Sequence, residues 1–148
     1  MKPHPIQLLN VQVEELNILV HDRVSFLNTD YPKTFDYSVS RTNFDEQNNL
    51  IAVKVDLDIK PEEEGVIDRP FSLKVSVSAQ FSVNVATFPV EKIYIWAENN
   101  APIVILPYVR EHVYMLTMRA GFDPVILPLV EVPTIKIVSP EQGNEIQS

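Results

Sequence analysis

Few side chains in this sequence have the types and spacing that catalysis or metal binding requires. The three histidines, His4, His21 and His112, fall in a terminus, a loop and a predicted helix. No spacing links them as metal ligands or as a base and its nucleophile. The chain has no cysteine, which excludes disulfides, zinc–thiolate sites and thiol nucleophiles. We therefore expect no metal site.

The carboxylates offer one further candidate for chemistry. Asp56 and Asp58 share one face of a predicted strand, as a pair of catalytic carboxylates would. Lys54 and Lys60 flank them and neutralise their charge, which is typical of a solvated sheet face. Glycine-rich phosphate loops and the Gly-x-Ser-x-Gly elbow are absent, and the chain has only 3 glycines. We expect no enzyme, no catalytic residue and no cofactor.

The composition is that of one folded, acidic domain. The chain has 148 residues, of which 45% are hydrophobic, and this is enough to build a single core. Its 20 acidic residues outnumber its 12 lysines and arginines, and the formal net charge of -8 would repel a phosphate backbone. We expect a single domain over residues 1–148 with frayed ends at 1–5 and 141–148, and no nucleic-acid partner.

The sequence shows no segment that would enter a membrane. The N-terminus lacks the long apolar stretch of a signal peptide, and no apolar run approaches the roughly 20 residues of a membrane span. We expect a cytoplasmic protein without membrane insertion.

Alternating apolar and polar residues predict an antiparallel sheet in the first half of the chain. The first strand carries one reversal of the alternation, near residues 8–10 or 14–15, which indicates a bulge. The segment 21–33 holds turn-forming residues among isolated apolar side chains, and predicts a long crossing loop. The four predicted strands span residues 6–20, 35–42, 50–60 and 71–85.

The periodicity changes after residue 89. Pro102 suits a first helical turn, and an apolar stripe at spacings of three and four predicts a helix of about five turns that ends at Gly121. Pro107 lies inside this helix and predicts a kink or a separate first turn. Residues 93–97 fit either a strand or a helix, and the segment 124–133 is expected to be extended. The predicted stripe consists of Leu106, Val109, Val113, Leu116 and Ala120.

The predicted helix also carries the clearest resemblance to a known family. The stretch Ile105-Leu106-Pro107-Tyr108-Val109-Arg110-Glu111, followed by Arg119 and Phe122, resembles the motifs that open and close the main helix of the SecB protein-export chaperones. The resemblance covers residues 6–130, because the order of four strands and then a helix matches too. The segment 134–140 reads as extended, so we expect a divergent member without the family's second helix.

The resemblance implies an α+β fold: a four-stranded antiparallel sheet with a long crossing loop after strand 1, one main helix and an extended C-terminal segment. It implies an ATP-independent holding chaperone that binds non-native or extended polypeptides, in preprotein export, and that assembles as a dimer or tetramer. The alternative is a structural or adaptor module that binds one dedicated protein partner. The range of proteins that are bound distinguishes the two functions, because only a chaperone would hold unrelated unfolded proteins.

A holding chaperone needs apolar, aromatic surface that accepts many sequences. Aromatic residues in loops and at the ends of elements are therefore the candidate client contacts. For each of them the ordinary alternative is that it closes one end of the core. The candidates are Phe26, Tyr31, Phe35, Trp96 and Phe122.

Two further surfaces are candidates for binding protein partners. Glu15 and the run of Glu62, Glu63 and Glu64 resemble acidic positions that the family presents to the SecA motor, although an acidic hairpin tip is also typical of a solvated surface. A four-stranded sheet covered by one helix leaves apolar surface that a second subunit would bury. The candidates for that oligomer interface are Tyr108, Arg110, Met115 and Met118.

Overall fold

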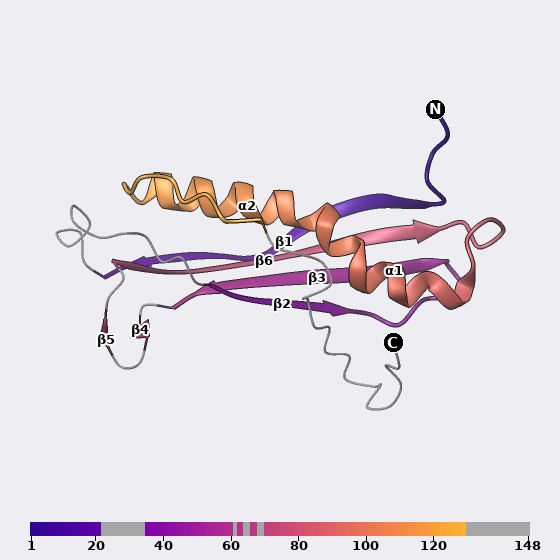
Figure 1. Cartoon of the computed structure of the whole chain (residues 1–148), viewed down its shortest axis with the longest axis horizontal. Coiled ribbons are helices and arrows are strands. Elements are labelled where there is room, and N and C mark those ends of the chain that lie inside the picture. Colours follow the sequence, from indigo (N-terminus) through magenta and orange to yellow (C-terminus); the bar gives the residue numbers. More distant parts are fainter. Residues whose placement is uncertain (22–34, 61, 64–65, 68–69, 130–148) are drawn as a thin grey trace.

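Four strands form an antiparallel sheet in the spatial order β1-β6-β3-β2 (Figure 1). The computed structural model describes residues 1–21, 35–60, 62–63, 66–67 and 70–129. A short two-stranded ladder, which the sequence did not predict, forms in the connection between β3 and β6. The strands are β1 (Ile6–Val20), β2 (Asp36–Arg41), β3 (Leu50–Ile59), β4 (Glu62–Glu63), β5 (Val66–Ile67) and β6 (Phe71–Val83).

The alternating pattern of β3 and β6 separates a buried face of the sheet from an open polar face. Every second residue of β3, from Ile51 to Ile59, is buried, and the residues between them are only half-buried. The predicted strand 71–85 is two residues too long, because β6 ends at Val83. Asn84 then forms a turn: its side-chain oxygen accepts from the Ala86 N–H and its carbonyl accepts from the Phe88 N–H. Such local hydrogen bonds compete with the strand ladder.

Strand β1 changes register against β6 at two places. The shifts lie between Leu8 and Asn10 and between Val13 and Glu15. The sequence predicted one reversal, at one of these two positions, whereas the structure has a reversal at both. Each inserted residue reverses the alternation, so the second reversal restores the parity of the first part of the strand. The apolar side chains that consequently share one face of β1 are Ile6, Leu8, Val11, Val13, Leu16, Ile18 and Val20.

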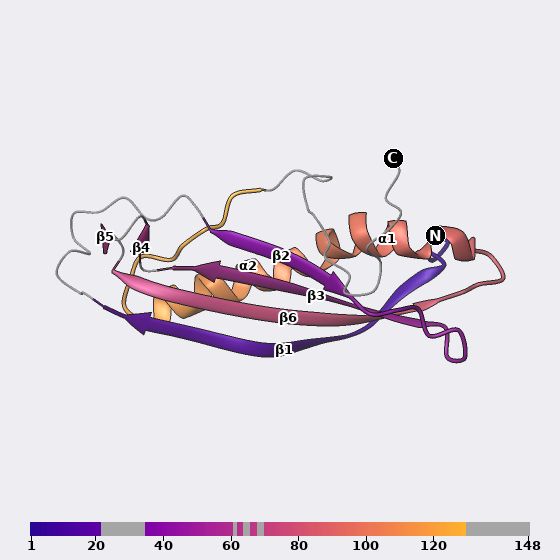
Figure 2. The same ribbon diagram turned by 90° about the horizontal axis from the view of Figure 1, so that it is seen from below.

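Two helices pack against the buried face of the sheet, and Figure 2 shows the longer one, α2, behind the strands. A 3-10 turn, η2 (Val90–Lys92), leads into α1 (Ile93–Asn99), which settles the open alternative for residues 93–97 as a helix. Helix α2 (Ala101–Arg119) follows and runs through Pro107 as one helix, so its first turn is not a separate element.

The buried stripe of α2 differs from the predicted one. The fully buried side chains recur every fourth residue and include Ile105 and Thr117, which the prediction missed. Leu116 and Ala120, which it included, are only half-buried, because they lie on the flank of the helix. The fully buried stripe consists of Ala101, Ile105, Val109, Val113 and Thr117, and the predicted Leu106 is buried beside it.

Gly121 ends α2 as predicted. Its φ of 89° is in the left-handed region, which glycine adopts without strain. The N–H of Gly121 donates to the carbonyl of Met118, and the N–H of Phe122 donates to the carbonyl of Thr117. These two bonds form a Schellman motif and turn the chain back along the helix, as Figure 1 shows.

The order of the strands confirms that the chain crosses the sheet after β1. Strands β1 and β2 are consecutive in sequence but lie at opposite edges of the sheet. Residues 22–34 between them lie outside the described residues, as do the segments 130–148 and Glu64. His4 and Pro5, placed by the sequence in a frayed end, make contacts: His4 Nδ1 accepts from the N–H of Ile6, and the Pro5 carbonyl accepts from the N–H of Asn84.

Candidate functional site

A shallow groove runs between α2 and the segment 122–129 that follows it. Its volume is about 300 Å³, and we call it the α2–tail groove. In the tail, Val125 and Leu127 point into the core, while Ile126 is 79% exposed and Leu129 is 85% exposed. The residues that line the groove are Pro107, Arg110, Glu111, Tyr114, Met115, Val125, Ile126 and Leu127.

One buried hydroxyl fixes the wall of this groove. Thr117 Oγ1 donates toward the carbonyls of Val113 (2.9 Å) and Tyr114 (3.0 Å), and accepts a hydrogen bond of 2.9 Å from the N–H of Val125. The Val125 amide is thereby satisfied in the protein interior, where an unpaired N–H is costly. The tail is thus attached to the helix by a hydrogen bond as well as by apolar packing.

Two buried polar atoms, one on α2 and one on the sheet, have no hydrogen-bond partner among the described residues. The atoms are Arg110 Nε and the hydroxyl oxygen of Tyr37, which comes from β2. Arg110 Nη2 makes only a long contact of 3.5 Å to the carbonyl of Pro128. Burial raises the pKa of the Tyr37 phenol, and the positive charge of Arg110 acts in the opposite direction, so the two groups are electrostatic neighbours.

The outer face of α2 carries a second apolar surface. Val104 and Tyr108 are exposed, Met118 is exposed in the last turn, and Met115 is half-buried between them. These positions follow the alternating spacings of four and three residues that bring side chains to one side of a helix, with Glu111 between them. We call this set, without Glu111, the α2 outer face.

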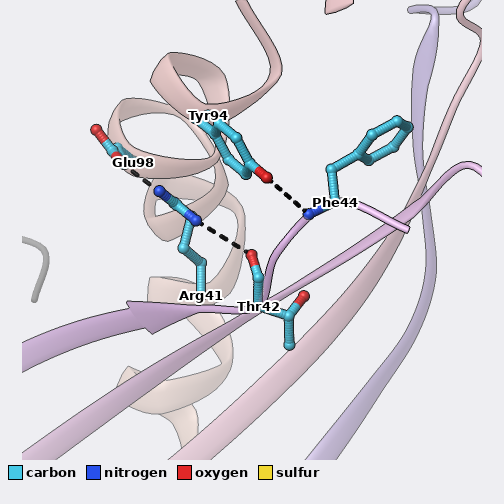
Figure 3. A network of polar contacts seen from close by, with 5 residues as sticks. All are labelled: Arg41, Thr42, Phe44, Tyr94 and Glu98. Carbon is cyan, nitrogen blue, oxygen red and sulfur yellow. Dashed lines mark hydrogen bonds and ion pairs between the residues drawn. The ribbon is translucent and has the colours of Figure 1, made fainter. Parts of the chain in front are cut away.

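A buried arginine holds α1 against the end of β2 (Figure 3). The Arg41 side chain is 1% exposed, and its Nε lies 3.2 Å from Glu98 Oε1. Its guanidinium lies 3.9 Å from the centre of the Tyr94 ring, a favourable cation–π distance. The Tyr94 hydroxyl accepts from the N–H of Phe44 at 3.1 Å, and Arg41 Nη1 donates to the carbonyl of Thr42. We call this network the Arg41 clasp.

The five predicted client contacts do not lie together in one surface of the described structure. Phe26 and Tyr31 lie outside the described residues. Phe35 and Trp96 are partly buried against the core, with Trp96 edge-on to Phe81 at 5.0 Å. Phe122 requires a correction, because it is 5% exposed and its ring packs 5.0 Å from that of Phe71. A ring already covered by the core offers no surface to a client.

The predicted partner-docking and interface residues also fall in different places. Glu15 lies on the open face of the sheet, 3.3 Å from the ammonium group of Lys74. Glu62 and Glu63 form β4. Tyr108, Met115 and Met118 share the α2 outer face, and Met115 also lines the groove. Arg110, predicted for the interface, instead points toward the tail.

Sequence reasoning missed Thr117, which holds the tail beside the groove, and the buried hydroxyl of Tyr37. Tyr37 lies in a strand whose alternation assigns it to the core, and nothing local shows that its hydroxyl lacks a partner. Thr117 carried a weak signal, because it stands four residues after Val113 in the stripe and a buried threonine in a helix needs an acceptor. Within the described ranges, no group of three or more histidine, aspartate and glutamate side chains gathers as a metal site requires. None of the described helices is long and apolar enough to cross a membrane.

A four-stranded antiparallel sheet covered on one face by a long helix, with β1 and β2 at opposite edges, defines the SecB-like class of α+β proteins. The chain belongs to the SecB family: the family model described as "Preprotein translocase subunit SecB" matches residues 6–135. No curated protein matches the sequence.

One solved structure supports this assignment of the fold. The chain is similar to the Mycobacterium tuberculosis Rv1957 SecB-like chaperone, solved in complex with a ChAD peptide from the Rv1956 HigA1 antitoxin. The two are 18% identical with a TM-score of 0.67, over 88% of this chain and 94% of that one. A protein of unknown function from Streptococcus agalactiae is similar at 13% identity and a TM-score of 0.44, over 84% of this chain and 97% of that one.

Proposed function

We propose that this protein is an ATP-independent holding chaperone that binds non-native or extended polypeptides. The observation that carries the proposal is the α2–tail groove, where apolar side chains of a helix and of an extended segment lie open side by side. Membership of the SecB family supports it. The structurally similar Rv1957 chaperone was solved with a peptide bound, which supports a peptide as the ligand here.

The surface chemistry fits holding rather than catalysis. Apolar residues stand exposed on α2 and on the tail, and exposed apolar surface of this kind marks sites that bind proteins. In the described residues, β1 and β2 pair with a neighbour on one side only, so each offers an edge to an extended backbone. The net charge of -8 would keep a loaded complex soluble in the cytoplasm, where we propose that the protein acts.

We infer that the protein assembles as a homo-oligomer, a dimer or tetramer, through the α2 outer face. Tyr108 and Met118 would then pack against a second copy, with Met115 at the border of the interface. Arg110 leaves this set, because its guanidinium is turned toward the tail. A helix face of this composition would gain stability by being covered.

We propose preprotein export as the setting, with SecA as a partner that docks on acidic side chains. The family description supports this setting. Glu15, one of the predicted docking residues, pairs with Lys74 and stays at the surface. Reversing the charge of Glu15, Glu62, Glu63 and Glu64 should weaken SecA binding measured by light scattering. Unchanged affinity would remove SecA from the proposal.

The experiment that tests the holding function is the refolding of several unrelated denatured proteins with stoichiometric amounts of the purified chain. Delay of all of them is the expected result. The pair Tyr114→Ala and Met115→Ala in the groove should shorten the delay, whereas Leu9→Ala on β1, also exposed, should not. Phe26→Ala with Tyr31→Ala tests the two predicted aromatic contacts. If every denatured protein refolds at its normal rate in the presence of the wild-type chain, the holding function is refuted.

The alternative is an adaptor for one dedicated partner. The peptide bound to the similar Rv1957 chaperone comes from one particular antitoxin, and this favours a narrow client range as a second candidate. The same refolding experiment separates the two functions. An adaptor would leave all unrelated proteins to refold freely and would be recovered with a single partner.

A further inference from the structure

His112 lies on the flank of α2 that faces the β1 edge of the sheet. On the other flank, Arg110 contacts the carbonyl of Pro128 in the tail and is an electrostatic neighbour of Tyr37 on β2. His112 follows Arg110 by two residues, which is about 200° around the helix axis. Because β1 and β2 are opposite edges of the sheet, this rotation directs the imidazole toward the β1 side.

The helix side of β1 is only partly covered by this chain. Val13 and Leu16 pair with Val77 and Val75 of β6, whose side chains are fully buried on the helix side of the sheet. On that same side, Val13 is 46% exposed and Leu16 is 42% exposed. The reason is that β1 is an edge strand (Figure 2), whereas α2 packs chiefly against β6 and β3. Apolar surface therefore stays open on the side of α2 to which His112 points.

The charged and titratable groups around His112 are few. The residues on the helix side of β1, β6 and β3 are all apolar, so no carboxylate of these strands faces the imidazole. On α2 the ring is flanked by Tyr108 and Leu116 one turn away, and Arg119 follows two turns further on. The adjacent Glu111 lines the α2–tail groove instead. A proton on the imidazole would find no acidic partner among these groups, and the cation on its side of the helix has the same sign.

We propose that His112 makes the self-association of this chain sensitive to acid. The inference rests on the proposed homo-oligomer and assigns a regulation to it. His112 is half-buried and lies between the α2 outer face and the exposed pair Val13 and Leu16, so a second copy that packs on this side of α2 covers the imidazole. A neutral imidazole can be covered at small cost, whereas a protonated one loses its hydration and gains no partner. Acid therefore separates the copies.

The net charge of the chain makes the direction of this effect diagnostic. Two copies of formal net charge -8 repel each other, and they approach with the least repulsion at a face that has no carboxylate. Acid reduces this negative charge, so the repulsion as a whole would weaken and association would become stronger. Weaker association in acid must then arise from a group that becomes positive in the interface, and histidine is the side chain that does so between about pH 8 and about pH 5.

The test is sedimentation velocity of the full chain over a dilution series at about pH 7.5 and about pH 5.5. The dissociation constant of wild type should rise at least about tenfold at the lower pH. His112→Gln should assemble equally at both pH values, because glutamine is polar but does not titrate. His21→Gln removes an exposed histidine that lies directly after β1 and contacts Ser72, and this control should keep the acid response of wild type.

A second variant makes the test independent of how the fold itself responds to acid. His112→Lys carries its charge at neutral pH and should be dissociated at about pH 7.5, with a folded chain by circular dichroism. A folded His112→Lys protein with the wild-type dissociation constant would overturn the switch, as would an acid response of His112→Gln equal to that of wild type. A wild-type oligomer with one dissociation constant at both pH values would overturn the switch alone. A wild-type monomer at both would refute the proposed assembly together with the switch.

Discussion

The Thr117 hydroxyl and the backbone N–H of Val125 lie 2.9 Å apart in a hydrogen bond that joins the last turns of α2 to the tail. The two residues are both buried, so water does not compete for either group. The groove beside α2 exists because this bond and the Schellman turn at Gly121 hold the tail along the helix.

Replacing Thr117 by valine should loosen the tail. Valine keeps the shape of threonine but leaves the buried N–H of Val125 without an acceptor, which costs about 2 kcal/mol of unfolding free energy. Amide hydrogen exchange at Val125 should accelerate at the same time. Thr117→Ser keeps the hydroxyl and should keep the slow exchange. A Thr117→Val protein with wild-type exchange at Val125 would show that packing alone holds the tail.

Replacing Arg41 by methionine should destabilise the fold. The change leaves Glu98 without its cation, and breaking a buried ion pair costs about 3 kcal/mol, at the low end of the usual range because Glu98 is 24% exposed. Urea unfolding followed by the fluorescence of Trp96, the one tryptophan of the chain, measures the loss. Lys54→Met on the open face, which breaks an exposed pair with Glu14, should change stability little. Equal effects of the two variants would contradict the buried clasp.

The stability of the protein should decline in alkali partly through Tyr37. Burial holds the pKa of this phenol above its ordinary value in the folded state, so folding favours the protonated form. This contribution is fully present below the pKa of an unfolded tyrosine, about 10, and is lost as the pH rises through and beyond that value. Tyr37→Phe should therefore lose less stability than wild type between about pH 8 and about pH 11 in urea titrations. If the unfolding free energies of wild type and Tyr37→Phe fall in parallel as the pH rises, Tyr37 does not cause the loss of stability.

Charged substitutions on the α2 outer face should disrupt assembly. Tyr108→Glu combined with Met118→Glu would bury two carboxylates in the proposed interface, and desolvating an unpaired charge is costly. Sedimentation should show an oligomer for wild type and a smaller mass for the variant. Ile95→Glu, at a similarly exposed position on α1, should assemble normally. If the wild-type protein sediments as a monomer, the proposed interface is refuted.

The alternation in β3 and β6 was sufficient to predict the sheet, because in both strands apolar residues on a buried face alternate with mostly polar residues on the other face, where Ser76 alone is buried among the described residues. The two bulges of β1 were harder to predict. The second bulge returns the apolar residues to the alternation that they had before the first one, so the sequence resembles that of a strand with a single bulge. Phe122 was misplaced for another reason. It directly follows the glycine that caps α2, and a hydrophobic residue at that position commonly packs back on the helix.

The candidate site was predicted only in part. Helical spacing was sufficient to group Tyr108, Met115 and Met118 on one side of α2, and their role in an interface stays a prediction. The groove could not, because Val125 and Ile126 form it only after the tail folds back onto α2, and the sequence does not show which surface an extended segment will cover. The Tyr37 hydroxyl of β2 is buried within the electrostatic influence of Arg110 on α2, and no local pattern in the sequence predicts that these two residues come near each other.

The spatial order β1-β6-β3-β2 also has a consequence for biosynthesis. Residues of β1 pair with residues of β6, from Ile6 with Val83 to Val20 with Phe71, so the first strand to leave the ribosome must wait for the last. At about 5–20 residues per second, the interval is roughly 3–15 s. A chain that we propose protects other unfolded proteins thus begins its own existence with an unpaired strand of 15 residues.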